Sequence, residues 1–145
     1  LLKATITGFT LGTTAPQIFR ALVEATAYGT KAIVDRFEEE GIPINDIIGI
    51  GGIALKSPFV MQTMCDVINK PIKACNTDQA CALGAAMFAA TAAGVYSKVE
   101  DASAAMCSGF SKKYEPNPKH TEIYAQLYKK YLRLGQFTEK EFYHD

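Results

Sequence analysis

The chain lacks an excess of charge of either sign, because fifteen acidic residues balance its fifteen basic residues. Such a chain produces no overall field that would attract nucleic acid or an anionic membrane. It also lacks an apolar run of the roughly 18 residues that a membrane span requires. The longest candidate, residues 80–95, is shorter and rich in alanine and glycine. No basic-plus-apolar signal peptide opens the sequence.

Patterns of metal ligands are missing as well. The four cysteines include no C-x-x-C pair, and neither His120 nor His144 has a histidine or cysteine partner at helical spacing. A zinc site normally needs such spacings. We therefore predict no metal site, reduced thiols and a cytoplasmic location. The cysteines are Cys65, Cys75, Cys81 and Cys107.

The length of 145 residues corresponds to one domain, and a hydrophobic content of 48% is enough for a core. The chain begins with Leu1 and Leu2, not with methionine, and enters a strand-like segment almost at once. We therefore expect it to be a piece of a longer protein.

Strand-like and helix-like segments alternate along the first two thirds of the chain, which is typical of a parallel sheet. We predict strands over residues 4–11, 47–50 and 71–75, and helices over residues 14–40, 57–69 and 80–93. Two further helices, over residues 99–108 and 121–143, follow, with a polar linker at residues 111–119 between them. No internal repeat and no Walker-type phosphate loop is present.

The long helix over residues 14–40 has a clear apolar periodicity. Thr14 and Gln17 form a capping box at its start, and Gly41 is suited to end it. We predict that its buried face consists of Ile18, Leu22, Ala25, Gly29, Ala32, Ile33 and Phe37. We expect its charged residues Arg20, Glu24, Lys31 and Asp35 to be solvated. On the last helix, we predict a packing stripe of Ile123, Leu127, Tyr131 and Leu134.

The candidate site is the stretch from Ile47 to Pro58, where a β-branched strand leads into Gly51 and Gly52. Ser57 and Pro58 are suited to open the following helix. Ligands of open α/β sheets bind at the carboxyl ends of strands, and glycines let a ligand approach the backbone closely. The alternative interpretation is a tight turn with no ligand, because two glycines between a strand and a helix often have only that role.

The same residues also match the dinucleotide fingerprint G-x-G-x-x-A, from Gly49 to Ala54. We give this match little weight for two reasons. The fingerprint requires the helix to begin within the glycine run, whereas we expect it to begin at Ser57. It also requires an acidic residue at the end of the next strand, whereas Asp78 lies beyond the strand that ends near Cys75.

Two longer segments resemble the C-terminal domain of the FGGY carbohydrate kinases. They are Gly51–Val67, which contains Gly-Gly-Ile-Ala-Leu-Lys-Ser-Pro, and Thr77–Ala86, which contains Asp-Gln-Ala-Cys-Ala-Leu-Gly-Ala-Ala. The opening Gly8–Gly12 and the helix Phe19–Tyr28 fit the same family, so the resemblance runs from about Gly8 to the C-terminus.

The resemblance implies an α/β fold of the actin-like ATPase (ribonuclease H-like) class, present in part and followed by two extra C-terminal helices. Residues 1–145 would form one C-terminal nucleotide-binding domain that contributes the adenosine side of a cleft for MgATP. The adenosine motif falls on Gly51 and Gly52, with Lys56 bordering the nucleotide, although relatives often have asparagine there. A solvated turn residue is an equal alternative for Lys56. Asp78 and Gln79 would cap a helix behind the site.

The resemblance also implies that the catalytic aspartate, the phosphate loops and most of the sugar pocket precede this chain. We therefore assign no catalytic residue and expect no kinase activity from the chain alone. ATP, Mg²⁺ and a ketopentose would be the ligands of the whole protein, with L-ribulose favoured over xylulose, gluconate or glycerol. The missing N-terminal domain would be a partner. We also expect a homo-oligomer, because the strand at residues 4–11 would leave an open edge.

Two other functional classes stay open at this point. The chain could be a non-catalytic actin-like module that docks a partner through the helix at residues 121–143. It could also be a dinucleotide-binding domain, the lowest-ranked interpretation.

Overall fold

The computed structural model describes residues 4–142, which form two compact units. The first unit takes its residues from 1–45, 63–70 and 116–145, and the second consists of 46–62 and 71–115. Helix α3 (Pro58–Ile68) begins in the second unit and ends in the first.

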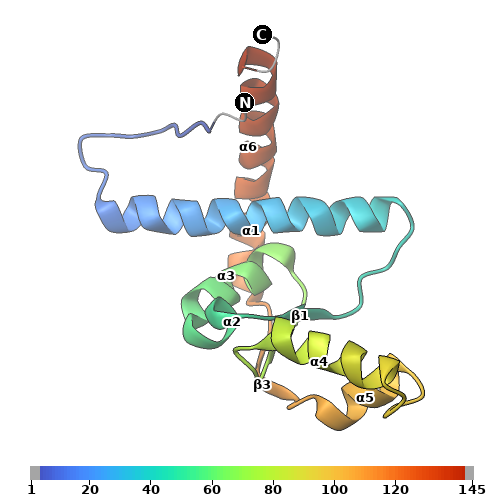
Figure 1. The fold of residues 1–145 in the computed structure, drawn as a ribbon. Coiled ribbons are helices and arrows are strands. Elements are labelled where there is room, and N and C mark those ends of the chain that lie inside the picture. Colours follow the sequence, from blue (N-terminus) through green and yellow to red (C-terminus); the bar gives the residue numbers. More distant parts are fainter. Residues whose placement is uncertain (1–3, 143–145) are drawn as a thin grey trace. The chain divides into compact units, whose positions relative to one another are not determined.

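Helices α1 (Ala15–Glu39) and α6 (Pro118–Phe142) dominate the first unit (Figure 1). They meet at a cluster of tyrosines, in which the Tyr28 ring lies 5.4 Å from the Tyr131 ring and 6.3 Å from the Tyr124 ring. Edge-to-face and tilted ring pairs of this kind stabilise beyond the area they bury. These tyrosines belong to a larger hydrophobic cluster. It consists of the buried Ala27, Tyr28, Val67 and Tyr124, with Met64, Leu127, Tyr128 and Tyr131 packed against them.

The structure confirms the long helix α1 and both of its predicted ends. Gln17 Oε1 accepts a hydrogen bond from the Thr14 backbone N–H at 2.8 Å, as a capping box requires. At the other end Gly41 has φ +80° and donates its N–H to the Glu38 carbonyl at 3.0 Å. A glycine adopts this left-handed conformation without strain.

The predicted buried face of α1 is only partly right, because Ile18, Ala25, Gly29 and Ala32 are half-buried while three of its four large residues are not. Leu22, Ile33 and Phe37 are 53%, 61% and 46% exposed, whereas Ala27, Tyr28 and Val34 are buried. Residues advance by about 100° along a helix, so the two sets centre on different sides of α1, although Val34 and Phe37 at their border are only about 60° apart.

The reason for the opposite orientation lies in the side chains that α6 contributes. The Tyr124 hydroxyl donates to Glu24 at 3.2 Å, and the Lys31 ammonium lies 5.3 Å from the centre of the Tyr128 ring. Tyrosines accept charged neighbours as well as apolar ones, so they pack against the polar side of α1. On α6 the packed residues therefore include Tyr124, while Ile123, predicted to pack, is exposed.

The predicted strand at residues 4–11 is also wrong, since this segment has no strand pairing and is drawn as an extended loop in Figure 1. A strand requires a neighbour for its backbone groups, and none of the described residues supplies one. Ile6, Phe9 and Leu11 are exposed. The predicted end of the last helix at Tyr143, and His144, lie outside the described residues.

The second unit contains a three-stranded sheet in the order β1–β2–β3. Strand β1 (Ile47–Gly49) pairs in parallel with β2 (Ile72–Cys75), with Gly49 opposite Ala74, as the alternating pattern predicted. Strand β3 (Phe110–Tyr114) pairs with β2 in antiparallel orientation, with Tyr114 opposite Ile72.

Strand β3 corrects the prediction of a polar linker over residues 111–119. Its first four residues are exposed and only Tyr114 is buried; Lys112, on the same side of the strand, lies 4.8 Å from the centre of the Tyr114 ring. Lysines are characteristic of the edge of a sheet, where they discourage pairing with another chain. The C-terminal helix then begins at Pro118 instead of Thr121.

Three helices complete the second unit: α2 (Gly52–Lys56), α4 (Ala80–Ala92) and α5 (Val99–Met106). Helix α4 contacts α5, and Gly94 ends α4 with φ +75°. None of the residues of α4 is buried. The core of the unit is made of Ala54, Met61, Ile72, Ala74, Cys75, Ala102 and Tyr114.

Candidate functional site

The candidate site is the turn between β1 and α2. Gly51 is the N-cap residue of α2, with φ +86° and ψ 177°, and its carbonyl accepts the Ala54 N–H at 3.2 Å. A side chain at this φ would be strained, so the turn requires glycine at position 51. The sequence therefore predicted correctly a strand, a glycine turn and a helix in this order.

The prediction that the first helix after the glycines begins at Ser57 is wrong, because α2 begins at Gly52. Ser57 separates two helices. Its N–H donates to the Ile53 carbonyl at 3.0 Å, and its Oγ accepts the Val60 N–H at 3.4 Å at the start of α3. One of the two objections to a dinucleotide fingerprint is thereby removed. The other stands, since β2 ends at Cys75 and Asp78 lies beyond it.

The three glycines of this region have different surroundings. A Cβ atom built on Gly51 or Gly52 would meet no described atom within 4 Å, so the space beside both residues is open. A Cβ atom on Gly49 would lie 2.6 Å from Met61 Cε and 3.4 Å from Ala54 Cβ. Gly49 therefore allows close packing inside the unit, whereas Gly51 and Gly52 leave backbone accessible from outside.

Lys56 is the last residue of α2 and is exposed. It follows Gly52 by four residues, and residues four apart lie on the same side of a helix. The structure thus brings Lys56 and Gly52 to one side of α2. Its ammonium group can extend toward a ligand that approaches the glycines.

The loop after β2 lies at the same edge of the sheet, because β1 and β2 are parallel and in register. The Asn76 N–H donates to the Gly109 carbonyl at 2.9 Å, and Thr77 Oγ1 accepts the Gln79 N–H at 3.2 Å. Gln79 is the N-cap residue of α4, but its side chain makes no capping bond. The expected caps Asp78 and Gln79 are thus only partly right, since Thr77 supplies the side-chain bond.

Acidic residues do not gather at this turn. Within residues 4–142 no group of three or more histidine, cysteine, aspartate or glutamate side chains could hold a metal ion. Asp66 is buried in α3 and accepts the Asn117 N–H at 2.8 Å. This carboxylate therefore holds the structure together instead of facing a substrate.

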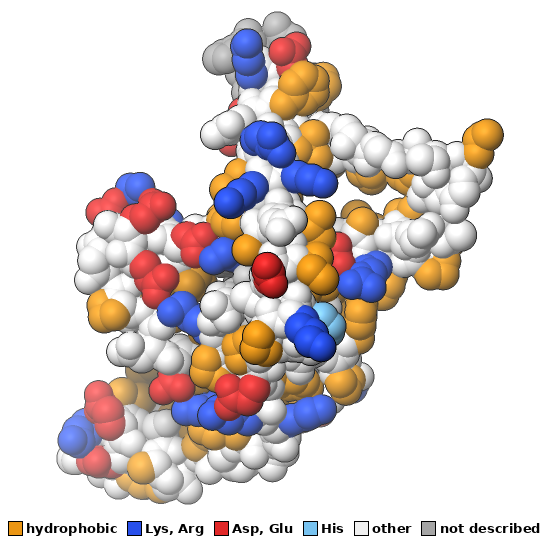
Figure 2. All heavy atoms as spheres, turned by 180° about the vertical axis from the view of Figure 1, so that it is seen from behind, with side chains coloured by type: hydrophobic (Ala, Val, Ile, Leu, Met, Phe, Trp, Pro, Cys, Tyr) orange, Lys and Arg blue, Asp and Glu red, His pale blue; other side chains and the backbone are white. Residues whose placement is uncertain are grey.

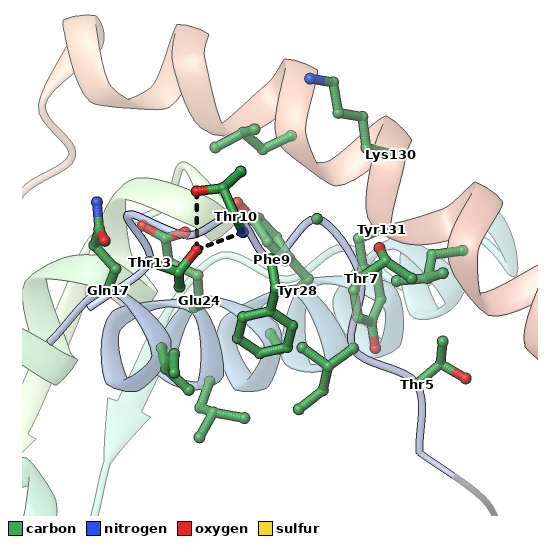
Figure 3. A pocket seen from close by; sticks show the side chains of 18 of the residues that line it. Thr5, Thr7, Phe9, Thr10, Thr13, Gln17, Glu24, Tyr28, Lys130 and Tyr131 are labelled. Carbon is green, nitrogen blue, oxygen red and sulfur yellow. Dashed lines mark hydrogen bonds between the residues drawn. The ribbon is translucent and has the colours of Figure 1, made fainter. Parts of the chain in front are cut away.

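A cavity of about 710 Å³ lies in the first unit, between residues 5–13, α1 and α6 (Figure 3). Small-molecule sites have volumes in this range. On one wall Glu24 accepts hydrogen bonds from Arg20 Nε at 2.8 Å and from the Tyr124 hydroxyl at 3.2 Å. The Glu24 carboxylate raises the pKa of Arg20, and burial raises the pKa of Tyr28 well above its usual range. The Tyr28 hydroxyl is buried and has no hydrogen-bond partner among the described residues.

Sequence reasoning did not find this cavity. Its floor consists of residues from the predicted buried face of α1, among them Ile18, Leu22 and Ala25. The only signal was the strand-like pattern at residues 4–11, which indicated a segment in need of a neighbour.

Comparison with known proteins gives the family of the chain. Residues 1–93 match the model of the "FGGY family of carbohydrate kinases, C-terminal domain". The chain belongs to this family. It is 50% identical over 139 residues to a ribulokinase from Vibrio parahaemolyticus. The aligned region covers 96% of this chain and 24% of that protein. The chain is 44% identical over 144 residues to a ribulokinase from Bacillus licheniformis, which covers 97% of this chain and 26% of the relative.

The fold of these FGGY kinases is present in the chain. The crystal structure of xylulose kinase from Rhodospirillum rubrum superimposes with a TM-score of 0.80 at 28% identity, over 97% of this chain and 28% of that one. This match and the mixed α/β architecture with its small sheet confirm the actin-like ATPase class. The chain spans about a quarter of the length of the curated relatives it matches.

Proposed function

We propose that the chain is the adenosine-binding part of an ATP-dependent sugar kinase that phosphorylates a hydroxyl of a ketopentose. L-Ribulose is the favoured substrate, ahead of xylulose, gluconate and glycerol. The observation that carries the proposal is the 50% identity with a ribulokinase over almost the whole chain. We also propose a role in L-arabinose catabolism, to which L-ribulose belongs, and a cytoplasmic location. For the part of the chain that the structure describes, no helix is long and apolar enough to cross a membrane.

The turn at Gly51 and Gly52 fits a nucleotide. The open space beside both glycines lets a flat base or ribose come close to the backbone, and Lys56 on the same side of α2 can reach ribose or phosphate oxygens. When bound, ATP supplies the phosphoryl group, and Mg²⁺ neutralises charge on its phosphates. The residues of this chain would hold and orient the adenosine end, while the sugar and the catalytic base require residues of the whole protein.

A titration of the chain with MgADP and MgATP, followed by calorimetry and NMR, tests the site. Gly52→Val is the informative variant, because position 52 is helical, has open space for a side chain and does not require a positive φ. We expect weak binding by the wild type, with a dissociation constant of about 1 mM or lower. The valine side chain would occupy the space of the nucleotide, so binding should be lost.

Gly135→Val is a matched control, because Gly135 is also helical with nothing within 4 Å of a built Cβ atom. It should cost similar helix propensity and leave binding unchanged. Gly51→Ala is less suitable, since strain at φ +86° would confound the result. Equal binding by wild type and Gly52→Val would reject the site. The same titration of a full-length kinase that carries this C-terminal part, with L-ribulose and the other sugars added, then tests substrate and activity.

The proposed partners of the chain in the whole protein are its N-terminal domain, the nucleotide and the sugar. A homo-oligomer is also proposed, and sedimentation velocity over a range of concentrations tests it. A monomer at every concentration would contradict it.

A further inference from the structure

The C-terminal end of helix α1 carries three consecutive acidic residues, Glu38, Glu39 and Glu40, which we call the acidic end of α1. All three are exposed. Glu39 and Glu40 share one cation, because Arg36 lies 3.7 Å from the Glu39 carboxylate and also contacts Glu40, while Glu38 pairs with Lys70 at 2.8 Å. The C-terminus of a helix carries a partial negative charge, so carboxylates are unfavourable there. Three carboxylates that share two cations therefore leave an excess of negative charge at this end.

Helix α6 carries a cluster of the opposite sign. Residues 123–138 contain no acidic residue and three basic ones, Lys129, Lys130 and Arg133, which we call the α6 basic cluster. All three are exposed, and within residues 4–142 none of them forms an ion pair. Lys129 and Arg133 are four residues apart on one side of the helix, so their charges repel each other.

The α6 basic cluster faces away from the side on which this helix is packed. Lys129 and Arg133 are each two residues from Tyr131, which packs against Tyr28, so they lie about 200° from Tyr131 around α6. In Figure 2, Lys and Arg side chains gather on α6 in the upper part of the view, and acidic side chains gather at the end of α1 on the left. Both clusters belong to the first unit. One unit therefore presents two exposed charge clusters of opposite sign.

A partner that carries charges of both signs matches these clusters better than a partner of one sign. Nucleic acid would be attracted by the α6 basic cluster but repelled by the acidic end of α1, and the chain has no net positive charge to attract it. A foreign acidic polypeptide would leave the acidic end of α1 without a role. A second copy carries both clusters, and a net charge of zero does not oppose its approach.

We propose that the acidic end of α1 in one copy of the kinase binds the α6 basic cluster of a second copy. In a dimer with two-fold symmetry this contact forms twice, because each copy supplies one cluster to each contact. Each cluster is unfavourable alone and becomes favourable in the pair. Phe137, which is 53% exposed and lies one turn after Arg133, adds apolar area to the same contact. The inference deepens the homo-oligomer proposed above by assigning its interface, and it does not depend on the nucleotide site.

The test uses the full-length kinase that carries this C-terminal part. Sedimentation velocity over a range of concentrations should show a dimer. Its association should weaken about tenfold or more when the ionic strength rises from about 0.05 M to about 0.5 M, since salt screens exposed charges. Glu39→Lys and Arg133→Glu should each weaken association about tenfold or more, because each places like charges opposite one another in both contacts. Circular dichroism verifies that both variants are folded.

A mixture of these two variants gives the decisive measurement. In a mixed dimer, one contact joins the two changed positions with their charges exchanged, and the other contact keeps the original Glu39 and Arg133. The mixture should therefore associate about as strongly as the wild type, although neither variant does so alone. A contact within one chain could not produce this recovery.

Lys113→Glu is the matched control, because Lys113 is 56% exposed on β3 and belongs to the other unit. It should sediment as the wild type does, and it should not restore association when mixed with Glu39→Lys. The MgADP titration described above should be the same for all of these variants, so a failure of the nucleotide site stays distinguishable.

Three outcomes would overturn the proposal. A monomer at every concentration would reject both the interface and the homo-oligomer. A dimer that both reversals leave intact, or a mixture without recovery, would reject the interface alone. Binding of an RNA oligonucleotide or of poly-glutamate that Arg133→Glu abolishes, with no wild-type dimer, would assign the α6 basic cluster to a different partner.

Discussion

Asp66 connects two helices of the first unit through its buried carboxylate. One oxygen accepts the Asn117 N–H at 2.8 Å, immediately before α6 begins, and the other lies 2.9 Å from His120 Nδ1 in the first turn of α6. A carboxylate at a helix N-terminus satisfies free N–H groups and interacts favourably with the helix dipole. Asp66 thus acts as a cap for α6 that is supplied by α3.

Replacing Asp66 by alanine should destabilise the chain by about 2 kcal/mol, since the hydrogen bonds that its buried carboxylate makes with Asn117 and His120 are lost. Urea denaturation followed by circular dichroism measures this change in the free energy of unfolding. His120→Ala is the comparison. His120 is 54% exposed at its side chain, so its loss should cost clearly less. An equal cost for both variants would show that the histidine contact, not the capping bond, carries the stabilisation.

The tyrosines between α1 and α6 make the stability of the fold sensitive to alkaline pH. Burial, followed by the hydrogen bond with Asp35, raises the pKa of Tyr128 from 10.0 to about 12. Burial is also the first cause of the raised pKa values of Tyr28 and Tyr124. The folded state therefore holds these protons more tightly than the unfolded state does, and this contribution to stability is complete below pH 10.

We expect the free energy of unfolding to fall as the pH rises from about 10 toward 12, because the unfolded tyrosines ionise first. Urea denaturation at a series of pH values measures the slope. Tyr128→Phe should make the slope shallower, because one of the titrating groups is gone. Tyr96→Phe, which removes a tyrosine outside the cluster, is the control. A slope unaffected by Tyr128→Phe would contradict the assignment.

The sequence was a good guide to residues whose role is local. Gly51, Gly41, Thr14 and Gln17 could be placed correctly, because a positive φ or a cap depends on neighbours within a few positions. The role of Asp66 could not be predicted, since its partners lie 51 and 54 residues away. The assignment of Gly51, Gly52 and Lys56 to a nucleotide stays a prediction.

Strand β1 and the helices around it depend on a glycine in the strand. Gly49 faces Met61 of α3 and Ala54 of α2, and both of these residues are buried. A single methyl group at position 49 would displace only the flexible end of Met61. A branched side chain needs more space than this displacement provides.

Gly49→Val should therefore destabilise the second unit by about 2 kcal/mol, and Gly49→Ala by less. Thermal unfolding and urea denaturation of the single variants provide the values. The double variant Gly49→Val with Met61→Ala tests the cause. Because the shortened side chain at position 61 frees the space, the double variant should be destabilised by less than the sum of the two single variants. Simple additivity would show that Met61 is not the obstacle.

At the scale of elements, prediction succeeded where periodicity and breakers agreed. Helices α1, α3, α4 and α5 and strands β1 and β2 were located to within a few residues. It failed at β3. The sequence Phe-Ser-Lys-Lys-Tyr has a polar centre that indicates a loop, and it forms a strand because β2 offers a free edge beside it. It failed at residues 4–11 for the converse reason, because a strand-like sequence without a neighbour forms no strand.

For the whole molecule, the α/β class followed from the order of elements, and the family followed from the resemblance of two segments, Gly51–Val67 and Thr77–Ala86, to the FGGY kinases. The burial of α1 did not follow. Its periodicity identified an apolar side correctly, but the tyrosines of α6 pack on the other side. Periodicity indicates which side of a helix is suited to burial, and only the set of available partners decides which side is covered.

The route of the chain between its two units has a consequence for its synthesis. The first unit takes residues from three separate stretches, and its contacts Glu24–Tyr124 and Arg20–Tyr124 join positions 100 and 104 apart in sequence. At ribosomal rates of roughly 5–20 residues per second, α1 waits about 5–20 seconds for α6 to be made. During that interval both sides of α1 are exposed, so the nascent chain presents a binding site for chaperones. In the folded chain α6 covers one of these two sides.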